Sequence, residues 1–149
     1  MEPTLIARPA TILVGAVSHG GSICELWQAF DACADQIKHR IPGMYYEVHT
    51  HADDPESAPE YFVSVAVAAA EGIPDGLTVK RLPAGQYAVF THRLADGGFT
   101  GCNAAMNDWL ARGPYRLTAN VCIQVFDDRF QGVDHPDSVI DFLLPVQAT

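Results

Sequence analysis

Positive charge is scarce in this sequence of 149 residues. Nine lysine and arginine residues stand against 18 aspartate and glutamate residues, which gives a net charge of −9 at neutral pH and a pI near 4.8. Such a surface repels phosphate backbones, so we expect no direct nucleic-acid binding by this chain. The same surface favours the approach of cations or of a basic protein partner.

Long apolar runs and paired cysteines are also missing. No apolar run is long enough to span a bilayer, so we expect no membrane segment. The apolar segment 11–17 does not indicate a signal peptide, because Glu2 replaces a basic start and Arg8-Pro9 interrupts it. The four cysteines lack any Cys-x-x-Cys spacing, which favours reduced, mostly buried residues in a cytoplasmic protein. They are Cys24, Cys33, Cys102 and Cys122.

The motifs for metal binding, phosphate binding and covalent catalysis are incomplete. His49-x-His51 has no third or fourth ligand at a known spacing, so we expect exposed histidines and no metal site. Gly20-Gly21-Ser22 precedes a helix, but the lysine and longer glycine pattern of a phosphate loop are missing. The sequence has no Gly-x-Ser-x-Gly elbow. We therefore expect no cofactor and no catalytic triad.

Apolar periodicity predicts an alternation of strands and helices. Ser22 and Glu25 form a capping box before an apolar stripe that reaches Ile37, which predicts a first helix that Pro42-Gly43 stops. A second helix follows Asp96-Gly97-Gly98 and ends at Gly113-Pro114. Runs rich in β-branched and aromatic residues predict strands at 11–17, 44–50, 60–70, 77–81, 86–93, 121–127 and 139–146.

The two halves of the chain repeat this order. Gly20-Gly21 matches Gly97-Gly98, and Glu47-Val48 matches Gln124-Val125 at the same offset of 77 residues. This predicts one α+β domain, residues 1–149, built from two β-α-β-β units at about 1–73 and 74–149 with pseudo-twofold symmetry. Joined, the units would form one antiparallel sheet with both helices on one face. The opposite face would then form a ligand groove where the halves meet.

Alternation along two strands selects candidate groove residues. Val121, Ile123 and Val125 are uniformly apolar, so we expect them to meet the helices, together with their repeat mates Tyr46 and Val48. The opposite face carries Tyr45, Glu47, His49, Cys122, Gln124 and Phe126. Aromatic rings beside a carboxylate suit a hydrophobic cation. The alternative is an ordinary solvated sheet face with scattered aromatic residues.

Three further aromatic residues are candidates for ligand contact. Trp27 and Trp109 lie on the two predicted helices, where they would either anchor the core or place one ring edge on the ligand cavity. Tyr87 lies on the predicted strand 86–93. The full set of candidate ligand-binding residues is Trp27, Tyr45, Glu47, Tyr87, Trp109, Gln124 and Phe126.

Several landmarks in order resemble the AraC-type effector-binding, or GyrI-like, family. They are Leu26-Trp27, the segments 73–77 and 82–90, Trp109-Leu110, the segment 126–130 (Phe-Asp-Asp-Arg-Phe) and Leu144-Pro145-Val146, and together they cover nearly the whole chain. The resemblance implies the duplicated fold and a pocket between the halves that accepts amphipathic, often cationic, small molecules.

One position departs from the pattern of this family. The family usually has a glutamate where this chain has Gln124, and that glutamate contacts cationic ligands and is the candidate catalytic group of the hydrolase branch. We expect Glu47, the repeat mate, to substitute for it, and we favour a binding module over an enzyme. The alternatives are a small hydrolase with Glu47 as base, and a protein-interaction inhibitor such as an inhibitor of DNA gyrase.

The resemblance also bears on partners. Transcription factors of the family place a helix-turn-helix before the effector domain, and this sequence has no room for one. We therefore expect a stand-alone binder for drug or effector sensing or sequestration, or a sensor that acts through a protein partner, as a monomer or homodimer.

Overall fold

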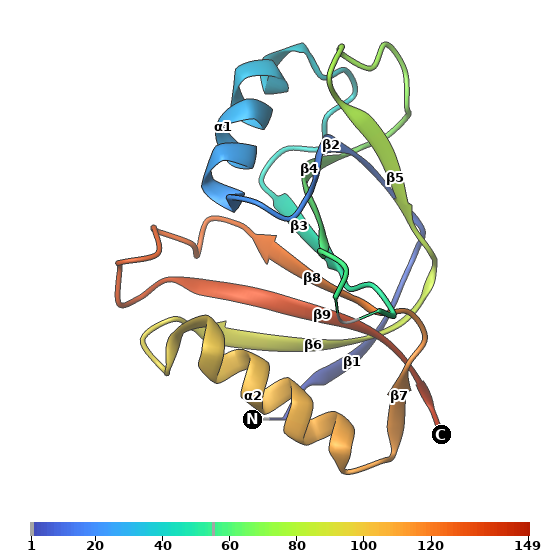
Figure 1. Ribbon diagram of the computed structural model, residues 1–149, viewed down its shortest axis with the longest axis vertical. Helices are drawn as coiled ribbons and strands as arrows, with labels where there is room; N and C mark the ends of the chain where they lie inside the picture. The colour runs from blue at the N-terminus through green and yellow to red at the C-terminus, as the bar shows by residue number, and fades with distance from the viewer. Residues whose placement is uncertain (1, 55) are drawn as a thin grey trace.

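The computed structural model of the chain describes residues 2–54 and 56–149. This part folds into nine strands, two α-helices and one short 3-10 helix, which Figure 1 shows in chain order. The helical elements are α1 (Ile23–Cys33), η1 (Ala34–Gln36) and α2 (Gly98–Ala111). The strands are β1 (Thr4–Arg8), β2 (Thr11–His19), β3 (Tyr45–Thr50), β4 (Glu60–Val67), β5 (Thr78–Leu82), β6 (Gly85–Arg93), β7 (Tyr115–Leu117), β8 (Val121–Phe126) and β9 (Val139–Ala148).

The sheet is antiparallel, with the strand order β1-β6-β9-β8-β3-β4-β2-β5, and β7 pairs with β9. Each strand of one half has its counterpart at the mirrored position in this order: β3 and β8 are central, β4 and β9 come next, then β2 and β6, then β5 and β1. The pseudo-twofold axis therefore passes between β3 and β8. The predicted α+β fold, with two helices on one face of a duplicated antiparallel sheet, is confirmed.

Strand β1 is an element that the sequence analysis missed. It pairs with β6 of the second half, while β5 pairs with β2 of the first half, so the halves exchange their outer strands. Both exchanged strands are five residues long and lie at the two ends of the strand order. Arg8-Pro9 interrupts the apolar pattern near β1, which hides this short strand in the sequence.

Helix α1 begins as predicted and ends earlier. The Ser22 hydroxyl accepts a hydrogen bond from the Glu25 amide at 3.2 Å, which satisfies one of the free donors of the first turn. The helix ends at Cys33 and continues as η1, so Ile37 is extended rather than helical. Ile37 is nevertheless buried against the same cluster as the helix, which explains its place in the apolar stripe.

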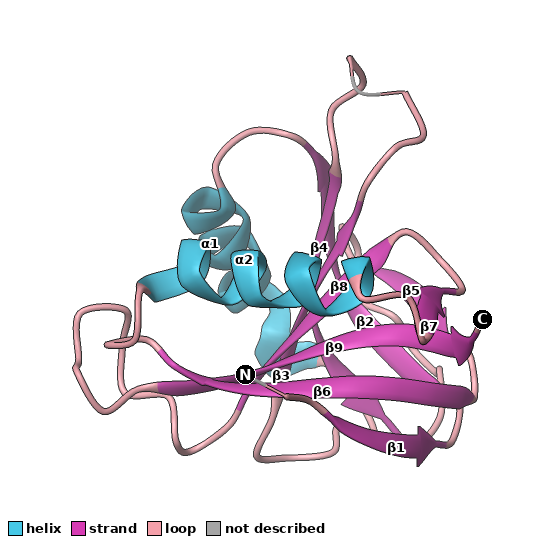
Figure 2. Ribbon diagram, turned by 90° about the horizontal axis from the view of Figure 1, so that it is seen from below, coloured by secondary structure: helices cyan, strands magenta, loops and turns pink. Residues whose placement is uncertain are grey.

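The two helices lie on the same side of the sheet (Figure 2) and cover separate parts of it (Figure 1). Leu26 and Phe30 of α1 pack on a cluster that includes Val63 of β4. Met106 and Trp109 of α2 pack on a cluster with residues from β6 and β9, namely Phe90, Ile140, Phe142 and Leu144. The central strands β3 and β8 lie between these two clusters.

The opposite face of the sheet forms a third cluster of its own. It contains Val48, Ile123 and Val125, together with Tyr46, Phe62, Tyr87 and Leu143. The prediction that Tyr46, Val48, Val121, Ile123 and Val125 meet the helices is wrong. The sheet curls, so that its apolar inner face packs against itself and needs no helix to cover it.

None of the helices in the described part of the chain combines the length and apolar character that a membrane crossing requires.

Candidate ligand-binding site

A cavity of about 770 Å³ opens between α1 and α2, and its floor is formed by β3 and β8. This volume lies in the range of pockets for drug-sized molecules. Its position corrects the sequence prediction, which placed the groove on the face away from the helices. The lining residues are Ile23, Cys24, Trp27, Asp31, Tyr45, Glu47, His49, His51, Phe99, Asn103, Cys122, Gln124, Phe126, Phe130 and Val133.

The floor of the cavity follows from the register of the two central strands. Glu47 lies opposite Gln124, and Tyr45 lies opposite Phe126. Opposite residues of an antiparallel pair project to the same face, with Cβ atoms about 4.5–5.5 Å apart. Helix α1 packs over β2 and β4, and α2 packs over β6 and β9, so the helices leave a cavity above the central strands that these side chains line.

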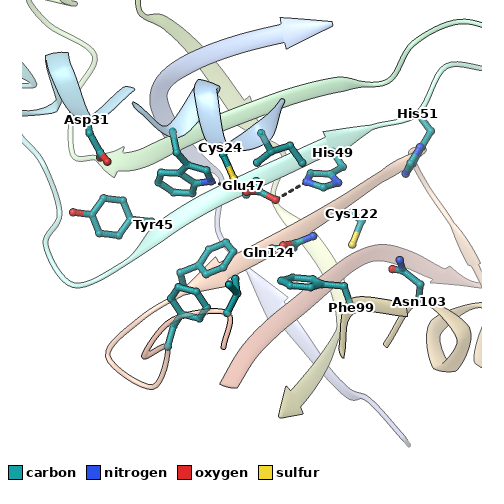
Figure 3. Close-up of a pocket in the computed structure, with 15 residues that line it drawn as sticks. Cys24, Asp31, Tyr45, Glu47, His49, His51, Phe99, Asn103, Cys122 and Gln124 are labelled. Carbon is teal, nitrogen blue, oxygen red and sulfur yellow. Dashed lines mark hydrogen bonds and ion pairs between the residues drawn. The ribbon is translucent and has the colours of Figure 1, made fainter. Parts of the chain in front are cut away.

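Glu47 is the most deeply buried acidic residue of the cavity, with only 5% of its surface exposed. The Trp27 indole N–H donates a hydrogen bond to Glu47 Oε1 at 2.7 Å, and His49 Nε2 lies 2.6 Å from Glu47 Oε2. Figure 3 shows the Glu47 carboxylate joined to the His49 ring by a dashed line. His49 in turn packs edge-on against Tyr61, at 4.9 Å between ring centroids. A carboxylate this deep is tolerable only with such partners.

Aromatic rings form the wall at one end of the cavity. Trp27 meets Tyr45 and Phe126 edge-on, at centroid distances of 5.8 and 6.0 Å. Phe130 packs edge-on against Phe126 at 4.9 Å. The Arg40 guanidinium covers the outer side of Tyr45, 5.3 Å from the ring centroid, and donates to its hydroxyl at 2.8 Å. These contacts fix the rings before any ligand arrives.

An ion-pair network anchors the loop that carries Phe130 and Val133 to the cavity. The Arg129 guanidinium donates to Asp127 at 2.8 Å and to Asp141 of β9 at 2.7 Å. The hydrogen bonds from Arg129 hold the pKa of the Asp127 carboxyl below its ordinary value. The Phe-Asp-Asp-Arg-Phe motif therefore builds one wall of the cavity.

Gln124 and Cys122 complete the floor on β8. Gln124 is 7% exposed, and its Oε1 has no hydrogen-bond partner within residues 2–54 and 56–149. Burial, followed by the proximity of Cys102 and Glu47, raises the pKa of the Cys122 thiol to about 12. The floor thus combines a carboxylate, an unpaired amide oxygen and a neutral thiol.

The structure brings five of the seven candidate residues together at the cavity. These are Trp27, Tyr45, Glu47, Gln124 and Phe126.

The other two candidates lie elsewhere. Tyr87 points into the inner core, where its hydroxyl donates to the Pro83 carbonyl at 2.8 Å. Trp109 is a core residue of the α2 cluster, stacked on Tyr115 at 5.3 Å. Both side chains lie outside the cavity because they pack within separate clusters.

Several lining residues were not among the candidates. Cys24 and Asp31 flank Trp27 at helical spacings of three and four residues, so the helix periodicity could have found them. His49, expected to be exposed, is half-buried against Glu47, since residues two apart on a strand share a face. Phe99 and Asn103, one turn apart at the start of α2, carried no signal that separated them from surface residues.

The comparisons with known proteins agree with this geometry. The sequence model of the Cass2 family, integron-associated effector binding protein, matches residues 14–146. The chain belongs to this effector-binding family. The resemblance to GyrI-like effector-binding domains that the sequence suggested is confirmed at the level of the family.

Among relatives of the effector-binding family, the transcriptional regulator BrlR of Pseudomonas aeruginosa (strain PAO1) is 29% identical over 153 residues. The match covers 98% of this chain and 56% of BrlR, so the chain spans about half the length of this curated relative.

Two solved structures share the fold. The C-terminal domain of EcmrR aligns with a TM-score of 0.75 at 12% identity, over 99% of this chain and 98% of that chain. SAV2435 bound to tetraphenylphosphonium aligns with a TM-score of 0.67 at 15% identity, over 99% and 94% of the two chains.

Proposed function

We propose that this chain binds a hydrophobic cation in the cavity between α1 and α2, as a module for sensing or sequestering such compounds. The observation that carries the proposal is Glu47, a buried carboxylate at the centre of an aromatic cavity. The solved neighbour SAV2435 is bound to tetraphenylphosphonium, a lipophilic cation, which supports the same ligand class.

The charges at the cavity favour a cation over an anion. In the described part of the chain, two carboxylates line the cavity, Glu47 on the floor and Asp31 at the rim, whereas lysine and arginine contribute nothing to the lining. A charge that enters a low-dielectric site needs an opposite charge nearby. Glu47 supplies that charge in a position that the hydrogen bonds from Trp27 and His49 have already fixed.

The walls favour a flat apolar body attached to that charge. The faces of Trp27, Tyr45 and Phe126 offer negative electrostatic potential as well as apolar area, and a desolvated cation on such a face gains about 2 kcal/mol or more. The cavity volume of about 770 Å³ accommodates several fused rings.

Two ligands with the same apolar body test the proposal. Isothermal titration calorimetry compares 1-naphthylmethylammonium with the neutral 1-naphthylmethanol. We expect the wild-type chain to prefer the ammonium, and Glu47→Gln to weaken ammonium binding by at least about thirtyfold with little effect on the alcohol. Asp31→Asn is the matched control, because an exposed rim carboxylate should change the affinity by less than about fivefold.

The same experiment distinguishes the alternatives. Equal binding of alcohol and ammonium in the wild-type chain, or ammonium binding that survives Glu47→Gln, would reject the cation proposal. Hydrolysis of an activated ester that disappears in Glu47→Gln would instead assign the small-hydrolase function, with Glu47 as base.

A further inference from the structure

We propose that the cavity selects cations that carry at least two N–H donors, such as primary or secondary ammonium and amidinium groups, over cations without N–H. The inference rests on the proposed function and names the ligand class within it. The feature that carries it is a pair of acceptors side by side on the floor, the Glu47 carboxylate and the Gln124 amide oxygen.

The register of β3 and β8 places these two acceptors together. Glu47 and Gln124 are directly opposite each other, and both side chains line the cavity. Figure 3 shows the Gln124 amide next to the Glu47 carboxylate, beneath the helix that carries Cys24. A ligand group with two divergent N–H bonds can donate one hydrogen bond to each acceptor. A site with a single buried carboxylate would not need a ligand with two N–H donors.

The Gln124 oxygen lacks a partner that a buried polar atom normally has. Only 7% of the surface of Gln124 is exposed, and its Oε1 accepts no hydrogen bond from any described residue. Most buried side-chain polar atoms are paired, and an unpaired one is destabilising. Gln124 lines the cavity, and its terminal torsion is broad and two-fold, so a half-turn of the amide would present this oxygen to a ligand. A ligand N–H that pairs it removes the cost.

Glu47 has capacity left for the same ligand group. Trp27 occupies one site on Oε1, and His49 occupies one site on Oε2. A carboxylate accepts about four hydrogen bonds, so further acceptor sites remain for a ligand. A quaternary ammonium or a phosphonium gains the charge of Glu47 but leaves Gln124 unpaired. An ammonium or amidinium group satisfies both residues.

The test uses a third ligand with the same apolar body, 1-naphthylmethyl-trimethylammonium, beside the primary ammonium. In the wild-type chain we expect the primary ammonium to bind at least about tenfold more tightly. Gln124→Met keeps the length of the side chain and removes the amide, so the preference should fall to within about twofold. The affinity for the trimethylammonium ligand should change little, which also shows that the variant is folded.

The outcomes separate this inference from the proposed function. Equal binding of the two cations by the wild-type chain, each tighter than 1-naphthylmethanol, would overturn the inference and leave the proposed function standing. A tenfold preference that persists in Gln124→Met would also overturn it, because another group would then read the N–H. Failure of both cations to bind more tightly than the alcohol would overturn the proposed function and this inference together.

Discussion

Alkylation of Cys122 measures the environment of the cavity floor directly. Its thiol pKa of about 12 reflects burial first, and the neighbouring Cys102 and Glu47 second. At about pH 8, a thiol with that pKa is ionised to roughly one part in ten thousand, against about a quarter for a free cysteine of pKa 8.5. The more basic thiolate is intrinsically more nucleophilic, which offsets about thirtyfold of the difference in ionised fraction. Cys122 should therefore react about a hundredfold more slowly than a free thiol.

The assay is iodoacetamide labelling followed by peptide mass spectrometry. Cys24, which is exposed at the rim of the same cavity, is the internal control for access of the reagent. The rate at Cys122 should rise about tenfold for each pH unit through pH 10, because only the thiolate reacts. A rate at Cys122 that matches N-acetylcysteine, or one that reaches a plateau below pH 10, would refute the assigned environment.

Two further predictions concern stability. Gly15→Ala should destabilise the fold by about 3 kcal/mol in urea denaturation, because the new Cβ would lie 2.0 Å from the Val63 carbonyl oxygen of the paired strand; a variant as stable as the wild type would contradict this close approach. Arg129→Gln should cost about 1 kcal/mol at pH 7, since the guanidinium is partly exposed. The pKa of Asp127 is lowered in the folded state, so the stability from its pairing with Arg129 is present above about pH 4 and is lost as the pH falls through the folded pKa. The difference between wild type and variant should accordingly shrink in urea titrations at about pH 3, and an equal difference at both pH values would reject the pairing.

The repeat made the centre of the fold predictable from the sequence. The shared offset of Glu47 and Gln124 identified them as repeat mates, and alternation placed them on one face of their strands. Because the pseudo-twofold axis passes between β3 and β8, these two repeat mates lie directly opposite each other. The floor of the cavity therefore followed from local periodicity together with the duplication.

The side of the sheet that carries the cavity was not predictable in the same way. Val48 and Ile123 are apolar because they face the interior of a curled sheet, and a pattern of alternation is the same whether a helix or the sheet itself covers that face. Tyr87 shows the same ambiguity, since it alternates correctly and yet packs into the inner core. The curl of the sheet depends on contacts between strands that are far apart in the sequence, such as β1 with β6.

Gln124 and Glu47 are repeat mates that lie opposite each other and differ in charge. The resemblance to GyrI-like domains implies a glutamate at the position of Gln124, whereas in this chain the carboxylate lies on the repeat mate, Glu47, directly across the axis. Two carboxylates buried at such a pair cannot both ionise, so an amide opposite Glu47 is the compatible choice. In the Gln124→Glu variant, one of the two carboxyl groups should stay protonated in the folded protein between about pH 5 and 8, although both are ionised in the unfolded chain. The free energy of unfolding should therefore fall as the pH rises through this range, by at most about 1.4 kcal/mol for each pH unit. Urea titrations measure this slope, and Gln124→Glu combined with Glu47→Gln, which has a single carboxylate, should show less than half of it. A Gln124→Glu chain with the pH profile of the wild type would mean that the two side chains do not share one buried site.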